Sequence, residues 1–445
     1  MHSLNHSIVL DRKTLVMVVF IYLSVFINSV VFFKEPVEFQ FGYLVYLILL
    51  PTFFVRYGIN RSLFFIFLTL LLVGMVNVFY GNNTAALFFK VFIGLSLSYF
   101  FYYYVVVEFD YNVEQLFQWY LKGCYIAALL GVFQFVSFQI GFEWGYWFGF
   151  ILNKWGVIKG GMFGIRLNSI FAEPTHLATV LSAAFFVSFY NLLRKEVYFY
   201  TRFQSVVIIV VFILSFSGVG QFGVFVTLIL LAVSFGLVRY IFIAIPVGII
   251  LFNVLYANVS EFRERLDGLT SLFAGEGFKL GKTHGSSFIL YNNFVVATEN
   301  FKQNFVFGTG IGSHPIAFEK YSIGKNIKVY GLNLNSADAN SMLLRLISET
   351  GIFGIGIFVI LIFKCYVRRN EHYDSYHWLV SNGILVMILL NLFRQGHYFL
   401  NGFPFFVILY YFNSVSYKLY LETSKDLYEQ TLAEKDQEKL ILPQL

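Results

Sequence analysis

The sequence predicts an all-α polytopic membrane protein that crosses the bilayer about twelve times and carries one large loop on its outer side. Three observations predict this fold. Hydrophobic residues make up 58% of the 445 residues and charged residues only 13%, too few to coat a soluble globule of this length. Apolar runs recur along the chain at roughly the 17 to 25 residues that a bilayer requires. The lysines and arginines gather in alternate connections between these runs.

The apolar runs predict twelve transmembrane spans, of which the pair that meets at residues 215–218 has the least definite boundary. The predicted spans are residues 15–33, 39–55, 63–80, 85–107, 116–140, 171–190, 203–216, 219–235, 240–257, 341–363, 378–393 and 403–420. They divide the chain into spans one to nine (1–257), a large outer loop (258–340), spans ten to twelve (341–420) and a charged tail (421–445).

The basic residues predict which loops lie inside the cell. With the N-terminus inside, the inner connections hold Arg56 and Arg61, then Arg194, Lys195 and Arg202, then Arg239, then Lys364, Arg368 and Arg369. Short inner loops are enriched in lysine and arginine. Both termini are therefore expected in the cytoplasm, and the loop 258–340 and the segment 141–168 outside. The net charge of +6 reflects this topology and does not indicate nucleic-acid binding.

Several common chemistries are not supported by any motif. Cys124 and Cys365 lie in or beside apolar runs and suggest neither a disulfide framework nor a metal cluster. Residues 275–283 resemble a phosphate-binding P-loop, but Glu276 stands where that motif needs glycine. There is no HExxH helix and no Asp-x-Asp pair. We expect neither a metal nor a cofactor.

The segment that enters the sixth span is the first candidate site. Pro174 suits the first turn of a helix, so this span is expected to begin near Ala172 or Glu173 with its N-terminus outward. The positive end of its dipole, with Arg166 nearby, predicts a cradle for a phosphate. Glu173 and His176, three residues apart, are expected to face the same site. The alternative is that Arg166 reaches lipid headgroups and Glu173 only caps the helix.

The second candidate region joins the large loop to the tenth span. Gly308, Gly310 and Gly312 predict a turn whose geometry needs glycine, although an ordinary turn before a helix is the alternative. Arg345 and Glu349 lie four residues apart in an apolar run and so share a helix face. Charges at such depth need a partner or a purpose. A structural ion pair and a role in binding both remain open.

Two further pairs of charged residues are predicted on the outer face. Arg394 and His397 occupy a short turn between the last two spans, where a solvated or headgroup-facing pair is the alternative to function. Arg263 and Arg265 follow the ninth span and would bind either a diphosphate or the membrane surface.

These motifs together resemble the bacterial O-antigen polymerase and ligase superfamily. The resemblance consists of Arg166 ahead of residues 171–174, the turn at 308–312, the stretch from Asn340 to Gly354, and a large outer loop between late spans. It implies a membrane fold similar to GT-C glycosyltransferases and an enzyme that acts on sugars carried by undecaprenyl diphosphate. Ligases of the superfamily carry a histidine where this chain has Ala339. The resemblance therefore favours a Wzy-type polysaccharide polymerase.

A polymerase of this kind would transfer a growing glycan to a sugar hydroxyl of a new lipid-linked repeat unit. The departing lipid diphosphate needs cationic stabilisation, for which the candidates are Arg166, Arg263, Arg265, Arg345 and Arg394. The acceptor proton needs a base, for which Glu173 ranks first, followed by His176, Asp338 and His397. The resemblance also implies a chain-length regulator and a flippase as partners, and O-antigen, capsule or exopolysaccharide as product.

The alternatives are an O-antigen ligase, a flippase or other transporter, and a nonenzymatic scaffold of an envelope assembly. A transporter is disfavoured because the two halves of the chain show no repeat, and because the long loop lies late and outside. The outer arginines make the scaffold less attractive.

Overall fold

Helices make up nearly all the regular structure of the parts that the computed structural model describes, which are residues 12–33, 38–195, 197–237, 241–258, 260–274, 285–324, 334–370 and 376–441. The helices are α1 (Arg12–Phe26), α2 (Phe41–Tyr57), α3 (Arg61–Phe79), α4 (Ala85–Glu108), α5 (Val113–Gln139), α6 (Glu143–Tyr146), α7 (Pro174–Leu193), α8 (Arg202–Leu214), α9 (Gly218–Ser234), α10 (Ile241–Asn258), α11 (Ser260–Phe273), α12 (Gly285–Gln303), α13 (His314–Tyr321), α14 (Met342–Cys365), α15 (His377–Arg394), the 3-10 turn η2 (Leu400–Gly402) and α16 (Phe403–Ile441). Two short antiparallel ladders pair β1 (Val31–Phe33) with β2 (Phe39–Gln40) and β3 (Ile158–Lys159) with β4 (Ile165–Arg166).

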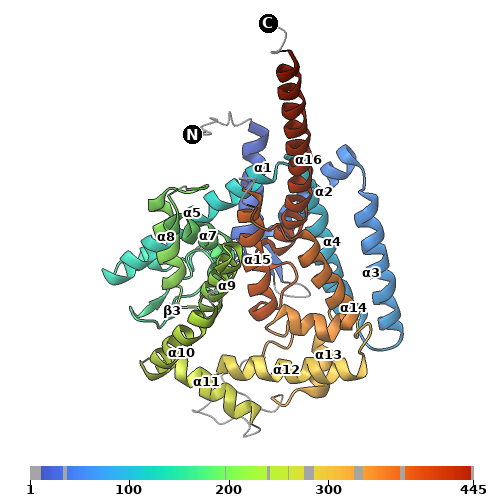
Figure 1. Ribbon diagram of the computed structural model, residues 1–445. Coiled ribbons are helices and arrows are strands. Elements are labelled where there is room, and N and C mark those ends of the chain that lie inside the picture. Colours follow the sequence, from blue (N-terminus) through green and yellow to red (C-terminus); the bar gives the residue numbers. More distant parts are fainter. Residues whose placement is uncertain are drawn as a thin grey trace.

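The start of α1 and the end of α16 lie at one end of the helix bundle, and α11, α12 and α13 lie at the other, which we call the distal end (Figure 1). The described part of the polar segment predicted as one large loop thus contains three helices. Its helical content was hidden because α12 buries polar side chains, including Asn292, Asn293 and Asn300, instead of an apolar stripe. Helix α16 covers the predicted twelfth span and continues into the charged tail as far as Ile441.

Six helices in the described residues are long and apolar enough to cross a membrane: α3, α4, α5, α7, α14 and α15. Four more apolar helices are shorter, namely residues 14–26, α2, α8 and α9. The chain is therefore an α-helical membrane protein with six candidate spans among the described residues, and the total of twelve spans stays a prediction.

The first predicted span illustrates why the lengths differ. Its apolar run extends to residue 33, yet α1 ends at Phe26. Beyond it the amide of Asn28 donates to the carbonyl of Val25 and to Oδ1 of Asn401, both within the protein. Residues 31–33 then pair as a strand with β2. Local polar hydrogen bonds therefore end the helix although the sequence remains apolar.

The centre of the bundle is formed by α7 and α15. In each of these helices 78% of the apolar window is buried, against 17% in α3 and α14, which present most of their surface outward. The two central helices approach closely at Gly383, where a Cβ would lie 3.3 Å from the carbonyl oxygen of Ala183. Small residues permit such contacts between membrane helices. The first turn of α7 and the last turn of α15 therefore have a rigid base.

Helix α14, the predicted tenth span, is broken at Gly351, which has φ 60° and ψ −158°. Only glycine adopts this conformation readily. The first part of α14 is buried at Arg345, Ser348 and Glu349. The second part exposes a mostly apolar surface that includes Ile357, Ile360 and Phe363.

Candidate functional site

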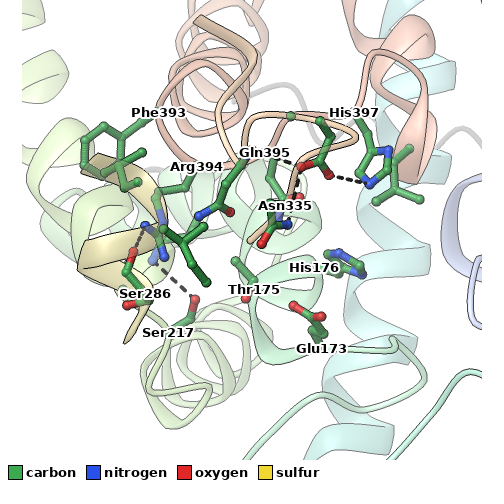
Figure 2. Close-up of a pocket in the computed structure, with 18 of the residues that line it drawn as sticks. Glu173, Thr175, His176, Ser217, Ser286, Asn335, Phe393, Arg394, Gln395 and His397 are labelled. Carbon is green, nitrogen blue, oxygen red and sulfur yellow. Dashed lines mark hydrogen bonds and ion pairs between the residues drawn. The ribbon is translucent and has the colours of Figure 1, made fainter. Parts of the chain in front are cut away.

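A polar cavity of about 590 Å³ lies between the first turn of α7, the start of α9, the start of α12, the turn before α14 and the turn after α15. Its lining includes six residues that the sequence singled out: Arg166, Glu173, His176, Asp338, Arg394 and His397. Figure 2 shows Glu173, Thr175 and His176 facing the turn that carries Arg394, Gln395 and His397. The fold thus brings together two stretches more than two hundred positions apart in the sequence.

Helix α7 begins where the sequence predicted. Glu173 is its N-cap residue, with extended φ and ψ of −140° and 152°, and Pro174 is the first helical residue. The Glu173 side chain makes no capping hydrogen bond and is exposed towards the cavity. Its carboxylate is therefore available to the cavity, and the reading in which it only caps the helix is not what the geometry displays.

Arg166 is positioned by a buried amide network beneath β4. Oε1 of Gln134, a fully buried residue in α5, accepts the backbone N–H groups of Asn168 and Ser169 at 3.3 and 2.9 Å. Its amide nitrogen donates to Oδ1 of Asn168 at 2.9 Å, and Asn168 in turn donates to the carbonyl of Phe171. A polar side chain inside a membrane helix is costly unless it is paired in this way. The network fixes the backbone between Arg166 and Glu173.

Asp338 and His397 form an ion pair at the opposite wall, with 2.9 Å between Oδ2 and Nε2. The other carboxylate oxygen accepts the N–H of Asn340 at 2.9 Å. The Asp338 side chain is 11% exposed and the His397 side chain 40% exposed, so the imidazole is the partner that a bound molecule reaches. A buried carboxylate that orients an accessible imidazole is a common acid–base arrangement.

The ionisation of Asp338 predicts a pH-dependent stability. Burial alone would raise the pKa of this carboxyl, but the charge and hydrogen bond of His397 and the N–H of Asn340 hold the pKa well below its usual range. Because the folded-state pKa is the lower one, the stabilisation is complete above the unfolded value of about 3.9 and is lost as the pH falls below it. We expect Asp338→Asn to destabilise the protein by about 1–3 kcal/mol at pH 5 to 8.

Thermal unfolding of the wild type and the Asp338→Asn variant in lipid nanodiscs measures this difference. The difference between the unfolding temperatures of the two proteins should become smaller as the pH is lowered from about 4.5 to 3. A gap that stays constant over this range would show that the charge of Asp338 does not contribute.

The turn that carries His397 lies directly on the turn that carries Asp338. A Cβ placed on Gly396 would be 1.6 Å from the carbonyl oxygen of Asp338. The carbonyl of Gly396 accepts a hydrogen bond of 2.9 Å from Arg345. Glycine is thus required at position 396 by close backbone approach and not by its torsion angles.

Gly396→Ala should therefore separate the two turns and lower the amount of folded protein. The clash involves backbone atoms, so the cost should reach or exceed the upper end of the about 1–3 kcal/mol seen for overpacked sites. Fluorescence size-exclusion chromatography after heating measures it. Gly356→Ala, where a Cβ meets nothing within 4 Å, is the matched control. Equal stability of the two variants would contradict the packing argument.

Arg345 and Glu349 lie outside the cavity lining and pair with each other, with 2.9 Å between Nε and Oε1. The Glu349 carboxylate also accepts the N–H of Gly312 and the hydroxyl of Tyr398, at 2.8 and 2.9 Å. These contacts join α14, the glycine turn and the turn after α15. Arg345 thus supports the wall of the cavity through Gly396, as the structural alternative for this pair anticipated.

The three predicted glycines form a turn that packs against the backbone of α14 where that helix is broken. Gly308, Gly310 and Gly312 all have positive φ, at 63°, 91° and 84°. The N–H of Gly310 donates to the carbonyl of Glu349 at 2.8 Å, and a Cβ on Gly308 would lie 2.4 Å from the Glu349 carbonyl carbon. Helix ends leave backbone groups without partners, and this turn supplies them. Its role is structural support of the site.

Arg394 extends from the last turn of α15 and donates to the carbonyl of Ser286 at 3.2 Å. Ser286 belongs to the first turn of α12, and Ser217, which also lines the cavity, is the N-cap of α9. The N-termini of α7, α9 and α12 therefore all meet the cavity. Each carries the positive end of a helix dipole, which favours an anion.

The remaining predicted arginines, Arg263 and Arg265, both belong to α11. Arg263 is an exposed residue of α11 and is not part of the cavity lining, to which α11 contributes Leu266. Arg265 also belongs to α11, but its side chain lies outside the described part of the chain. Lys154 also lines the cavity and pairs with Glu38 at 2.5 Å, although it was not among the predicted site residues. The one feature of the sequence that could have suggested Lys154 is its position in the predicted outer segment 141–168.

No known protein family has a model that matches the chain, and no curated protein matches it.

Proposed function

We propose that the chain is a polymerase that joins undecaprenyl-diphosphate-linked oligosaccharide repeat units at the outer face of a bacterial cytoplasmic membrane. The observation that carries this proposal is the convergence of Arg166, Glu173 and His176 with Asp338 and His397 on one polar cavity. In the orientation that the basic residues predict, both termini are cytoplasmic and the distal end, which contains α11, α12 and α13, faces outward.

The electrostatics of the cavity support a diphosphate as the leaving group. In the proposed reaction the bond between the anomeric carbon and the diphosphate oxygen breaks, and the anomeric carbon bonds to a hydroxyl oxygen of the acceptor sugar. Negative charge then grows on undecaprenyl diphosphate. Arg166 and Arg394 line the cavity together with three helix N-termini, and these positive groups are the candidates to stabilise the charge on the departing diphosphate.

The geometry supports His397 as the base that removes the acceptor proton. Asp338 holds the imidazole by Nε2, and His397 keeps 40% of its side chain accessible. The proton would pass from the acceptor hydroxyl to the imidazole, whose charged form the ionised Asp338 stabilises. Glu173, ranked first from the sequence, faces the same cavity beside His176 and is the competing candidate.

The size distribution of surface and lipid-linked polysaccharide, resolved on a gel after deletion of the gene and after complementation, tests the proposal. A polymerase predicts that single repeat units still reach their normal anchor while the ladder disappears. Long polymer stranded on the lipid carrier would indicate a ligase instead. An unchanged ladder would reject both enzymes, and loss of all lipid-linked sugar from the outer leaflet would indicate a flippase.

A further inference from the structure

The outward face of α5 carries a continuous apolar stripe. Ile126, Leu129, Phe133, Val136 and Ile140 follow one another at alternating intervals of three and four residues and are between 44% and 72% exposed. This spacing keeps them on one side of a helix. Because α5 is one of the candidate spans, the stripe is a surface for lipid acyl chains.

The stripe does not end with the helix. Directly beyond it, Phe142, Trp144, Trp147, Phe150 and Ile151 are each at least 40% exposed. Their rings contact one another, with centroids 5.9 Å apart for Trp144 and Phe150 and 6.2 Å apart for Trp147 and Phe150. We call residues 142–151 the aromatic segment. In Figure 1 the strand β3 that follows it lies on the side of the bundle away from α3.

The aromatic segment is fixed to the protein through the residues that follow it. Leu152 and Trp155 are buried, and the Trp155 indole donates to the carbonyl of Ser169 at 2.7 Å. Asn153 exchanges hydrogen bonds of 2.9 and 2.5 Å with the backbone N–H and carbonyl of Val31. The exposed rings therefore stand on an ordered base, and their exposure is a property of the fold.

We propose that the aromatic segment is inserted into the outer leaflet, where lipids cover its rings. Three observations select lipid as the occupant: continuity with the stripe of α5, the tryptophans typical of the boundary between acyl chains and headgroups, and a polar rim. That rim consists of the exposed residues Glu143, Asn153 and Lys159. Lysines at such a rim extend towards phosphate headgroups.

This insertion would also set the depth of the cavity. Lys154 lines the cavity and follows the aromatic segment by three positions, and Arg166 lies on the neighbouring ladder. The cationic side of the cavity is then held at the level of lipid phosphates. The inference rests on the membrane fold and on the orientation predicted from the basic residues, and it stands or falls separately from the proposed reaction.

Substituted-cysteine labelling tests the insertion. The two native cysteines, Cys124 and Cys365, are buried and leave a low background. In proteoliposomes of phosphatidylethanolamine and phosphatidylglycerol, the cysteines of Ile151→Cys and Trp144→Cys should not react with a charged, membrane-impermeant maleimide. Lys159→Cys, on the polar rim, should label fully and corrects for the orientation of the inserted protein.

Labelling of Ile151→Cys as fast as Lys159→Cys would overturn the proposal. A cysteine that is protected from the maleimide in cell membranes but labelled in proteoliposomes would also overturn it, because this result would indicate a protein partner. Disulfide cross-linking of Trp144→Cys between copies would overturn it as well. A second measurement does not depend on the cysteine variants. Lipids with acyl chains brominated near the headgroup should quench the tryptophan fluorescence of the wild type more strongly than that of the Trp144→Phe/Trp147→Phe variant. Equal quenching of the two proteins would also contradict insertion.

Discussion

Replacing Arg166 with alanine is expected to abolish polymer while the protein remains in the membrane at its normal level. Arg166 lines the cavity, and its backbone is fixed by the network around Gln134. Removing one preorganised donor from developing negative charge typically costs about 10²–10³ in rate. Because each polymer needs many successive transfers, such a loss should eliminate the ladder. Arg166→Lys, which keeps the charge but loses the guanidinium fork, should give short chains.

The polysaccharide ladder and an immunoblot of the membrane fraction together measure this effect. Arg56→Ala is the matched control, because Arg56 pairs with Glu108 at 3.0 Å and does not line the cavity. That variant should keep a normal ladder. Full-length polymer from Arg166→Ala would remove Arg166 from the proposed site.

His397→Ala is expected to lower the rate of chain extension by about 10²–10⁴, the usual contribution of a general base. The measurement is transfer between purified lipid-linked repeat units in proteoliposomes. Asp338→Asn should also reduce the rate, because the amide no longer stabilises a charged imidazole. The binding of the lipid-linked donor should change little in either variant, since neither residue is assigned to the diphosphate.

Glu173→Gln is the decisive comparison for this assignment. If His397 is the base, Glu173→Gln should keep more activity than His397→Ala. The reverse order, with His397→Ala close to the wild type, would assign the proton transfer to Glu173. A loss of donor binding in His397→Ala would instead place His397 near the diphosphate.

The sequence was most informative where a single local rule determines the outcome. Pro174 located the start of α7, and the spacing of Glu173 and His176 anticipated that both line the cavity. The glycines at 308–312 announced a turn, because positive φ is costly for other residues. Local torsion preferences and helix periodicity suffice for such features.

Features that depend on contacts between distant segments could not be predicted. The approach of Gly396 to Asp338 brings His397 to its partner, and nothing in either local sequence indicates it. Ala339 and Asn340 adopt positive φ in the turn beside Asp338, which residue type alone did not suggest for the alanine. Helix α12 could not be predicted for a related reason, since its buried amides have the composition of a solvated loop.

The break at Gly351 divides α14 into a part that is held by contacts with the protein and a part whose surface is largely exposed. The part of α14 before it is tied to protein by Glu349, whereas the part after it exposes apolar residues such as Phe353 and Ile360. The N–H groups of Ile352 and Phe353 donate to the carbonyls of Phe305 and Val306, so the second part begins with its own hydrogen bonds. A helix responds to a thicker or thinner bilayer by tilting. With this break at Gly351, we expect tilting of the second part to leave the first part in place, together with the hydrogen bond of Arg345 to Gly396 at the cavity wall.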